Sequence, residues 1–312
     1  MPMAIHSEHA GKPRALITGL RGFTGRYLAQ ELASEGYQVF GTAHGDELRG
    51  PEVFSVDLRQ ADQVRTLVER VQPDIVAHLA AISNVAFGNV DTIYGVNVVG
   101  TRNLLAALAA LKHKPRKVLV ASSANIYGNT EAQNINELEP AQPANDYAVS
   151  KLAMEYVCKI WMEQLPIVIT RPFNYTGVGQ AETFLLPKIV AHFRQRKPFI
   201  ELGNLDVERD FSDVRTVVKI YAKLLGLAPG GEVYNISSGL GTSLREVIAQ
   251  VEGLAGYKIQ VAVNPAFVRK NEVKKLVGDS SKLASLIGHV ATFPLQETLS
   301  WMLAASTEPV YS

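Results

Sequence analysis

The sequence predicts an α/β protein built on a doubly wound parallel sheet. Short runs rich in Val, Ile and Leu alternate with longer segments of helical period, which is the pattern of strands buried on both faces and joined by helices. The strand candidates are residues 15–18, 38–42, 74–79, 117–121 and 167–170. The helix candidates between them are residues 25–34, 61–71, 96–111 and 146–164, each long enough for a right-handed crossover.

After Arg171 the pattern changes, because glycine and proline interrupt the alternation of strands and helices. A helix near 213–227 and a strand near 232–236 follow this stretch. The sequence therefore predicts a smaller mixed α/β C-terminal domain whose segments interleave with the sheet domain. We expect residues 14–173 with about 207–236 to form the sheet domain, residues 174–206 with about 237–312 to form the second domain, and residues 1–13 to be a flexible leader.

The composition is that of a globular protein that acts on a small molecule. The chain has 312 residues, 47% of them hydrophobic, and a formal net charge of +1. Acidic and basic residues are interleaved, so no basic stripe is available for nucleic acid or anionic lipid. The longest apolar stretch, residues 104–111, is too short to span a membrane. Cys158 is the single cysteine, which excludes an intrachain disulfide and fits a buried helix residue in a reducing cytoplasm.

A glycine-rich loop directly follows the first strand candidate. It reads Gly19-Leu20-Arg21-Gly22-Phe23-Thr24-Gly25 and runs into a helical pattern. Glycines permit a tight turn and a close approach of the backbone to a ligand, and the N-terminus of a helix offers N–H groups and a positive dipole end to a pyrophosphate. In this context the loop predicts a dinucleotide-cofactor site rather than a structural glycine turn. The expected contacts are Gly19, Arg21, Gly22, Phe23, Thr24 and Gly25.

The end of the second strand bears on the choice between NADP and NAD. A carboxylate there would bind the adenosine ribose hydroxyls of NAD, yet the sequence reads Phe40-Gly41-Thr42-Ala43-His44. This favours NADP(H) and leaves NAD(H) as the alternative. Arg21 and His44 are candidates for contacts to a ribose 2′-phosphate, unless they are solvated surface residues. Asp57, after the next strand, is either an adenine contact or a helix cap.

Three residues form a candidate catalytic group. Tyr147 and Lys151 are four residues apart on a helix candidate, so they share a face, and an ammonium close to a phenol lowers its pKa from the usual value of about 10. A phenol tuned in this way can exchange a proton with an alcohol or a carbonyl near neutral pH. Ser123 follows a strand at the edge where parallel sheets carry their chemistry, and could hydrogen-bond the carbonyl oxygen that Tyr147 protonates. Alone, the spacing of the tyrosine and lysine would also fit an ordinary helix surface.

With these motifs in order, the chain resembles the extended short-chain dehydrogenase/reductases over nearly its whole length. The motifs are the glycine loop, His78-Leu79-Ala80-Ala81, Ser122-Ser123-Ala124-Asn125-Ile126-Tyr127-Gly128 and Tyr147-Ala148-Val149-Ser150-Lys151. The resemblance implies a Rossmann-type cofactor domain in which Ser123, Tyr147 and Lys151 are the catalytic triad and Lys151 also holds the nicotinamide ribose. Asn97 matches the position that supports the lysine, although it also fits a helix-end hydrogen bond. The implied cofactor contacts further include Asp57, Leu58, Leu79, Ala80, Ala81, Tyr147 and Lys151.

Three later segments resemble the substrate segments of the GDP-mannose 4,6-dehydratase and GDP-4-keto-6-deoxy-mannose reductase pair. They begin with Arg171-Pro172-Phe173-Asn174, Gly203-Asn204-Leu205-Asp206 and Arg269-Lys270-Asn271-Glu272. The resemblance implies that Asn174, Lys188 and Arg209 contact a diphosphate and that Arg269 and Glu272 hold the guanosine. A local ion pair between Arg209 and Asp210 is the alternative for the arginine. The chain departs from the family at Lys270, where a proline is usual, and at Asn271.

Asn125 occupies the place where the dehydratases carry a glutamate for the removal of water. An amide cannot take a proton from carbon, so the resemblance favours simple hydride transfer to the C4 keto group of a GDP-4-keto-6-deoxy-hexose. The expected substrate contacts are Ser123, Asn125, Asn174, Lys188, Arg209, Arg269 and Glu272.

Other functions remain open from the sequence. A nucleotide-sugar 4-epimerase uses the same triad but retains its cofactor, and a non-catalytic dinucleotide-binding protein would keep the loop without the chemistry. A 4,6-dehydratase is less favoured because of Asn125. The resemblance also implies a homodimer formed through the helices near 96–111 and 147–164. No metal is expected.

Overall fold

The computed structural model of the protein describes residues 11–43, 52–83, 89–267 and 273–305. The chain divides into two compact units. The first comprises Met1–Ala121, Ala153–Ile169 and Tyr221–Glu232, and the second comprises Ser122–Leu152, Thr170–Ile220 and Val233–Ser312. These bounds differ from those of the two domains expected from the sequence, which remain a prediction. The expected flexible leader falls almost entirely on residues 1–10, outside the described ranges.

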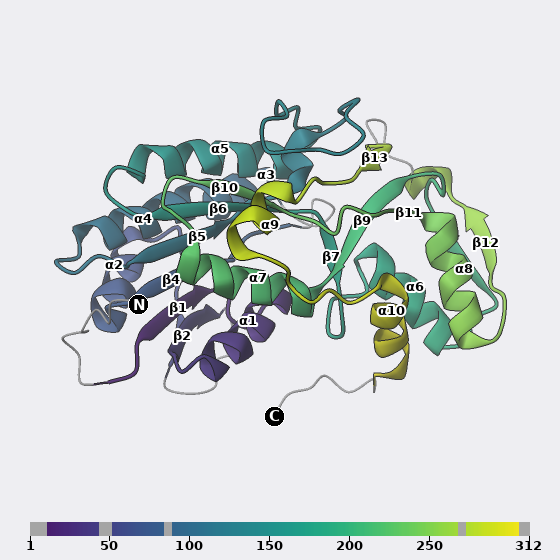
Figure 1. The fold of residues 1–312 in the computed structure, drawn as a ribbon, viewed down its shortest axis with the longest axis horizontal. Coiled ribbons are helices and arrows are strands. Elements are labelled where there is room, and N and C mark those ends of the chain that lie inside the picture. The colour runs from purple at the N-terminus through teal and green to yellow at the C-terminus, as the bar shows by residue number, and fades with distance from the viewer. Residues whose placement is uncertain (1–10, 44–51, 84–88, 268–272, 306–312) are drawn as a thin grey trace. The chain divides into compact units, whose positions relative to one another are not determined.

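A seven-stranded sheet carries the fold, and it confirms the predicted α/β class (Figure 1). Its strand order is β10-β6-β5-β4-β1-β2-β3, and the pairings of β1 with β2, β1 with β4, β2 with β3 and β4 with β5 are all parallel. Apolar runs such as Leu16-Ile17 and Val118-Leu119-Val120 are fully buried, as expected for strands covered on both faces. The strands are β1 (Arg14–Thr18), β2 (Gln38–Ala43), β3 (Val53–Ser55), β4 (Ile75–His78), β5 (Lys117–Ala121), β6 (Ile167–Pro172) and β10 (Val233–Ile236).

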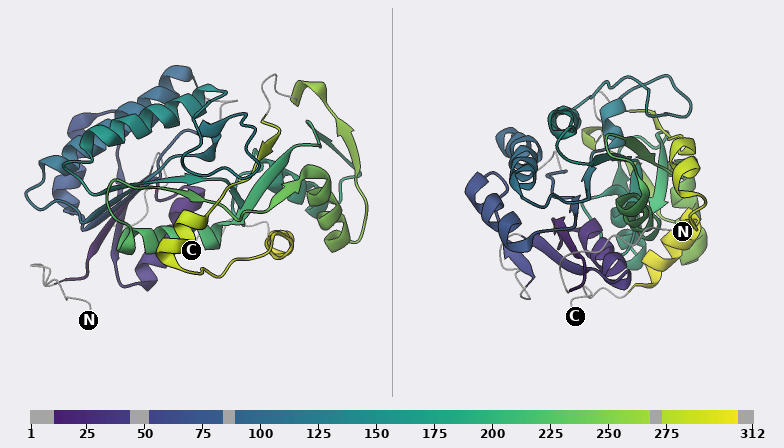
Figure 2. Two further views of the ribbon diagram at one scale, coloured as in Figure 1. Left: turned by 45° about the horizontal axis from the view of Figure 1, so that its top comes forward. Right: turned by 60° about the vertical axis from the view of Figure 1, so that its left-hand side comes forward.

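The strand order reverses at β1, because the chain moves outward through β2 and β3 and then returns to place β4 on the other side of β1. Right-handed crossovers in opposite directions place their helices on opposite faces. Accordingly α1 (Phe23–Ser34) covers one face, while α2 (Ala61–Val71) and α4 (Thr101–Ala110) cover the other (Figures 1 and 2). The carboxyl ends of β1 and β4 therefore lie side by side at the switch point, where sheets of this kind bind ligands.

The helix expected over residues 96–111 is longer in the structure and is not α-helical throughout. It starts with α3 (Val90–Tyr94), continues as a π-helical turn over Gly95–Gly100 and ends with α4. π-Helical turns are rare and occur frequently at functional sites. This turn contains Asn97, and the periodicity of apolar residues could not have revealed it.

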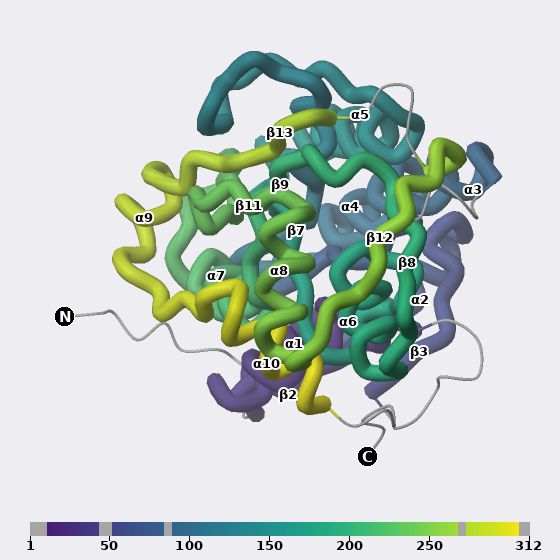
Figure 3. The backbone as a smooth tube through the Cα atoms, turned by 90° about the vertical axis from the view of Figure 1, so that its right-hand side faces the viewer, coloured from purple at the N-terminus to yellow at the C-terminus, as the bar shows by residue number. Residues whose placement is uncertain are grey.

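The second unit holds smaller sheets and the C-terminal helices. Strand β9 (Glu208–Asp213) lies between β11 (Gly241–Ser243) and β13 (Lys275–Leu276) and also pairs with β7 (Asn174–Thr176). Strands β8 (Phe199–Leu202) and β12 (Gln260–Val263) pair in parallel beside the helices of this unit (Figure 3). The helices of this unit are α6 (Leu185–Arg194), α8 (Leu244–Ala255), α9 (Ser281–Ile287) and α10 (Leu295–Ala304), whereas α5 (Asp146–Trp161) and α7 (Val214–Leu227) each contribute residues to both units.

One apolar core joins α6, α8 and α10 to β8. Ile189 and Phe193 of α6, Val247 of α8 and Leu299 of α10 are among its buried members. Helix α8 starts with a capping box between Ser243 and Glu246, so its N-terminus is fixed without help from a ligand.

Two further findings concern the described part of the chain. No helix there is long and apolar enough to cross a membrane. Across those same residues, no group of three or more His, Cys, Asp or Glu side chains could hold a metal ion. Cys158 is fully buried in α5, as its sequence context predicted.

Candidate active site

Gly19 forms the turn at the end of β1. Its φ of +72° is a conformation that residues with a side chain rarely adopt, and a Cβ at this position would lie 3.1 Å from the backbone N and Cα of Ala80. The Gly19 N–H donates to Oγ1 of Thr42 at 3.1 Å, and the Leu20 N–H donates to the Thr42 carbonyl at 2.9 Å. The second strand therefore fixes the loop through Thr42, a role that the sequence did not indicate.

The rest of the loop fits a dinucleotide pyrophosphate. A Cβ on Gly25 would lie 2.2 Å from the Gly19 carbonyl oxygen, so only glycine allows this packing. Helix α1 starts directly after Gly22, with no side-chain cap and no acidic residue in its first turn. No carboxylate in this turn would repel an anion that approaches the positive dipole end of the helix. Phe23 and Thr24 lie in this first turn, and the Phe23 ring packs edge-on against Tyr27 with centroids 5.7 Å apart.

A buried histidine links the ends of β1 and β4 to α4. Nδ1 of His78 lies 2.7 Å from the Thr18 hydroxyl, and Nε2 lies 2.8 Å from the Thr101 hydroxyl. The Thr18 hydroxyl also accepts from the Ala80 N–H at 3.2 Å. This network brings the predicted cofactor contact Ala80 next to the glycine loop, and Leu79 and Ala81 flank it in the chain.

Asn97 holds the segment that follows β4. Its Oδ1 accepts from the Ile82 N–H at 2.9 Å, and its Nδ2 donates to the Ile82 carbonyl at 3.1 Å. The Asn97 carbonyl in turn accepts from the Thr101 hydroxyl at 2.7 Å. In the first unit Asn97 thus holds the backbone that follows β4 through two hydrogen bonds with Ile82. The expected support of Lys151 by Asn97 stays a prediction.

Asp57 forms an ion pair with Arg59. Its carboxylate accepts from the backbone N–H of Arg59 at 3.0 Å and from the guanidinium at 2.7–3.1 Å. The N-cap of α2 is Gln60, so Asp57 is not the cap of that helix. Leu58 is buried, and its carbonyl accepts from Nδ2 of Asn103 at 2.9 Å. The adenine contact proposed for Asp57 remains a prediction, and so does the role of Arg21.

The second unit brings the three predicted catalytic residues together. Ser123 is the N-cap of a 3₁₀-helix, Ala124–Tyr127, and its hydroxyl accepts from the Asn125 N–H at 3.2 Å. Ser123 is hydrogen-bonded to the phenol of Tyr147, in the first turn of α5. Lys151 is buried, and its Nζ lies 6.0 Å from the centroid of the Tyr147 ring.

The acidity of Tyr147 differs from the expectation. The pKa of Tyr147 is raised to about 12, mainly by burial and to a lesser extent by Tyr175, while the hydrogen bond with Ser123 opposes this shift. The expected lowering of this pKa by Lys151 is therefore wrong for the protein alone, because the loss of solvation outweighs an ammonium at this distance. Tyr175, on β7, is a neighbour of the site that the sequence did not indicate.

Asn125 and Asn174 have exposed side chains, whereas Arg209 is half-buried. The Arg209 guanidinium donates to the carbonyls of Glu208 at 2.9 Å and Lys274 at 3.2 Å. Asp210, the alternative ion-pair partner, accepts from the Ser238 and Gly239 N–H groups at 2.8 and 2.9 Å.

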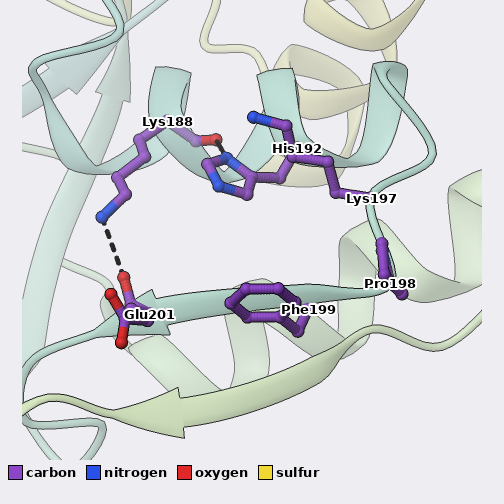
Figure 4. A pocket seen from close by; sticks show the side chains of 6 residues that line it. All are labelled: Lys188, His192, Lys197, Pro198, Phe199 and Glu201. Atoms are coloured by element: carbon purple, nitrogen blue, oxygen red, sulfur yellow. Dashed lines mark hydrogen bonds between the residues drawn. The ribbon is translucent and has the colours of Figure 1, made fainter.

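Lys188 lines a pocket of about 320 Å³ in the second unit. Figure 4 shows Lys188 and His192 projecting from α6 toward Phe199 and Glu201 on β8. The Lys188 ammonium donates to the Glu201 carbonyl at 2.8 Å and lies 4.7 Å from the Phe267 ring centroid. Three predicted residues, His44, Arg269 and Glu272, lie outside the described ranges.

The family model described as GDP-mannose 4,6 dehydratase matches residues 16–302. The chain is 33% identical to the GDP-6-deoxy-D-talose 4-dehydrogenase of Aggregatibacter actinomycetemcomitans, covering 88% of this chain and 92% of the relative. It is 32% identical to the GDP-6-deoxy-D-mannose reductase of Pseudomonas aeruginosa, covering 93% and 96%.

Two solved structures resemble the fold closely. One is a protein of Burkholderia cenocepacia J2315 that has been provisionally named an epimerase. Its TM-score is 0.89 and its sequence is 50% identical, and the match covers 95% of this chain and 98% of the other. The other is RMD from Pseudomonas aeruginosa complexed with NADPH, with a TM-score of 0.82, 31% identity, and coverage of 94% and 98%.

Proposed function

Because the chain belongs to the GDP-mannose 4,6-dehydratase family of extended short-chain dehydrogenase/reductases, we propose that it is an NAD(P)H-dependent reductase of GDP-4-keto-6-deoxy-D-mannose. The product is GDP-D-rhamnose or its C4 epimer, GDP-6-deoxy-D-talose. The names of two relatives, a GDP-6-deoxy-D-mannose reductase and a GDP-6-deoxy-D-talose 4-dehydrogenase, support a reaction at C4 of a GDP-linked 6-deoxysugar.

The presence of Asn125 is the observation that favours reduction over dehydration. It lies in the 3₁₀-helix directly after Ser123, at the place where the family's dehydratases have a glutamate, and its side chain is exposed. Removing water across C5 and C6 needs a base that takes a proton from carbon, and a neutral amide has no such capacity. Ser123, Tyr147 and Lys151 are sufficient for the simpler reaction.

Each catalytic side chain has one task. Ser123 hydrogen-bonds the C4 carbonyl oxygen and orients it toward Tyr147, whose phenol gives its proton to that oxygen as the ketone becomes an alcohol. Lys151 places a positive charge beside the phenol and limits the cost of the phenolate that remains. The bound nicotinamide cofactor supplies the hydride.

NADPH is the preferred cofactor in this proposal. The second strand ends at Ala43 without an acidic residue, so nothing in it would repel a 2′-phosphate. Arg21 and His44 are the proposed cationic partners of that phosphate. The binding of NADPH by RMD of Pseudomonas aeruginosa supports this choice, although other structural neighbours bind NAD.

The diphosphate of the sugar nucleotide is assigned to Asn174, Lys188 and Arg209. In the described residues Arg209 and Lys188 are held by backbone carbonyls, which keeps both cations in place before a ligand arrives. Arg269 and Glu272 are assigned to the guanosine.

A direct assay tests the proposal. Purified protein is mixed with NADPH and enzymatically made GDP-4-keto-6-deoxy-D-mannose, and the absorbance of the reduced nicotinamide is followed. We expect one NADPH to be consumed per sugar, and Tyr147→Phe should lose most of the rate. A sugar-independent loss of absorbance, or no loss, contradicts the proposal.

A nucleotide-sugar 4-epimerase is the second candidate, favoured by the provisional name of the Burkholderia cenocepacia protein. An epimerase keeps its cofactor through the cycle, whereas a reductase must exchange it at each turnover. Gel filtration of protein loaded with cofactor separates the two, because only the reductase is expected to release it.

We also infer a cytoplasmic homodimer. Helix α5 exposes an apolar stripe of Val149, Tyr156 and Ile160, with exposed fractions of 38, 60 and 71%. These residues share one helical face, and such a stripe is typical of a surface that packs against a second chain. Light scattering should give a dimer for the natural chain and a monomer for Tyr156→Glu.

A further inference from the structure

A buried network of hydrogen bonds holds Tyr127, the last residue of the 3₁₀-helix that Ser123 caps. The hydroxyl of Tyr127 donates to Oδ1 of Asn235 at 2.7 Å and accepts from the Arg171 guanidinium at 2.9 Å. Tyr127 and Asn235 are fully buried. The same arginine donates to the Glu137 carbonyl at 3.1 Å, and Nδ2 of Asn235 donates to the Ile135 carbonyl at 2.8 Å.

The two ends of this helix are attached to different strands. At the start, the Ser122 N–H donates to the Thr170 carbonyl on β6 at 2.7 Å. At the end, Tyr127 is held by Asn235 on β10 and stacks on Phe173 with ring centroids 6.2 Å apart. A 3₁₀-helix of a single turn has poor internal hydrogen bonds, so these outside contacts decide its tilt.

The helix is also packed against the segment that leads to Tyr147. The Gln142 N–H donates to the Ile126 carbonyl at 2.8 Å. Gly128 has a φ of +60°, and a Cβ there would lie 1.8 Å from the Gln142 carbonyl oxygen. Asn145 then starts α5 through an acceptor bond from the Ala148 N–H at 2.9 Å. The chain from Ser123 to Tyr147 is thus tied together near the end that Tyr127 anchors.

We propose that Tyr127 is a positioning residue for catalysis, holding the 3₁₀-helix through Asn235 and Arg171 so that the Ser123 hydroxyl meets the phenol of Tyr147. The proposal rests on the catalytic role proposed for Ser123. Its physical basis is the small size of the helix, because once the Tyr127 end is released a single turn can tilt about the Ser122–Thr170 bond at its start, and this tilt turns the Ser123 hydroxyl away from the phenol. Displacements of about 1 Å at a catalytic group cost up to about 100-fold in rate.

The role is distinct from that of a core residue. Tyr127→Phe keeps the ring, its stacking on Phe173 and nearly all of the buried volume, and removes only the hydroxyl that joins β10 to the helix. Tyr234, the neighbour of Asn235 on β10, is a matched control, since its side chain is also buried and its ring lies under the Lys282 ammonium at 4.9 Å. Tyr234→Phe likewise removes one phenol hydroxyl from a buried tyrosine.

A double-mutant cycle on kcat tests the proposal. We expect Tyr127→Phe to lower kcat by about tenfold with little change in KM for the sugar nucleotide. In a Ser123→Ala background the same change should lower kcat no further, because the group that it positions is gone. Tyr234→Phe should leave kcat as in the natural chain. Arg171→Lys, which changes the other bond to the Tyr127 hydroxyl, should repeat the non-additive result if Tyr127→Phe folds poorly.

The pH profile of the reverse oxidation gives a second readout. Among the described residues, Ser123 and Tyr175 act on the Tyr147 phenol, and the Lys151 ammonium lies 6.0 Å from the centroid of its ring. Because only Ser123 depends on the network, Tyr127→Phe should move the alkaline rise in rate to higher pH, as Ser123→Ala does. A purely structural role would leave the profile in place.

The possible outcomes separate the two proposals. If Ser123→Ala keeps the rate of the natural chain, both the catalytic assignment and the positioning role are contradicted. If Ser123→Ala is slow but Tyr127→Phe behaves like Tyr234→Phe, or if its effect adds fully to that of Ser123→Ala, the positioning role alone is overturned.

Discussion

Ser123 is hydrogen-bonded to the phenol of Tyr147, and this bond opposes the burial that raises the pKa of Tyr147 to about 12. The site therefore keeps the phenol protonated at neutral pH, which is the form that a ketone reductase needs in a proton donor. The serine stabilises the phenolate left after the proton has moved, and this links substrate orientation and proton transfer in one side chain.

Ser123→Ala should raise the pKa of Tyr147 further, since the hydrogen bond that stabilises the phenolate is lost. In the direction of alcohol oxidation Tyr147 acts as a phenolate, so the rate rises with pH through its pKa. We expect the rise to shift to higher pH in the variant and kcat to fall by about 100-fold or more. Because a pKa of about 12 lies above the range of pH 7 to 10.5, the rate should rise about tenfold per pH unit in both proteins over this range, with the profile of the variant displaced to higher pH; superimposed profiles would contradict the assigned bond.

Gly25→Ala should abolish tight cofactor binding. The new Cβ would lie 2.2 Å from the Gly19 carbonyl oxygen, so the loop must open away from α1. We expect the Kd for NADPH, measured by fluorescence titration, to rise at least about tenfold, which is about 1.4 kcal/mol. Gly226→Ala, near the end of α7, is the control and should bind like the natural chain, because a Cβ there would meet no atom within 4 Å beyond its chain neighbours and its own helix backbone. Equal affinities for the two variants would contradict the loop assignment.

His78→Leu should destabilise the first unit. Leucine removes both ring nitrogens, and the hydroxyls of Thr18 and Thr101 lose those bonds in a buried place. Each hydroxyl keeps one other partner, so the expected loss in the free energy of unfolding is about 1–3 kcal/mol, from about 0.5–1.5 kcal/mol for each of the two lost hydrogen bonds. Urea unfolding measures it, with the exposed His113→Leu as control. A loss no larger than that of the control would show that the network contributes nothing.

Asp210→Asn should weaken the second unit. The Asp210 carboxylate is buried and accepts from the Ser238 hydroxyl and from the N–H groups of Ser238, Gly239 and Gly278. An amide would turn N–H groups toward some of these donors, so we expect a loss of about 1.5–3 kcal/mol in the free energy of unfolding. Asp206→Asn, at an exposed ion pair with Arg245, should cost less than about 1 kcal/mol. Equal effects in the two variants would contradict this account of Asp210.

The parts of the fold predictable from sequence are those set by local pattern. The apolar runs of β1, β4 and β5 and the glycine loop gave the sheet and the switch point, because buried parallel strands need continuous apolar residues and a tight turn needs glycine. The spacing of Tyr147 and Lys151 likewise fixes one helical face. Ser123 could be joined to them only through the resemblance to a family.

The rest depends on contacts between distant residues. The π-helical turn around Asn97, the bond from Gly19 to Thr42 and the neighbourhood of Tyr175 arise from packing, and no spacing in the chain encodes them. The expected low pKa of Tyr147 failed for the same reason, since helical spacing gives a direction for Lys151 but no measure of burial.

The destination of the hydride is the most direct test of the central claim. The protein is incubated with GDP-4-keto-6-deoxy-D-mannose and NADPH carrying deuterium at both C4 positions of the nicotinamide, and the product is examined by NMR. We expect one deuterium at C4 of the sugar, an alcohol in place of the C4 ketone, and an equal amount of NADP⁺. Unlabelled sugar, or label at any other carbon, would contradict it.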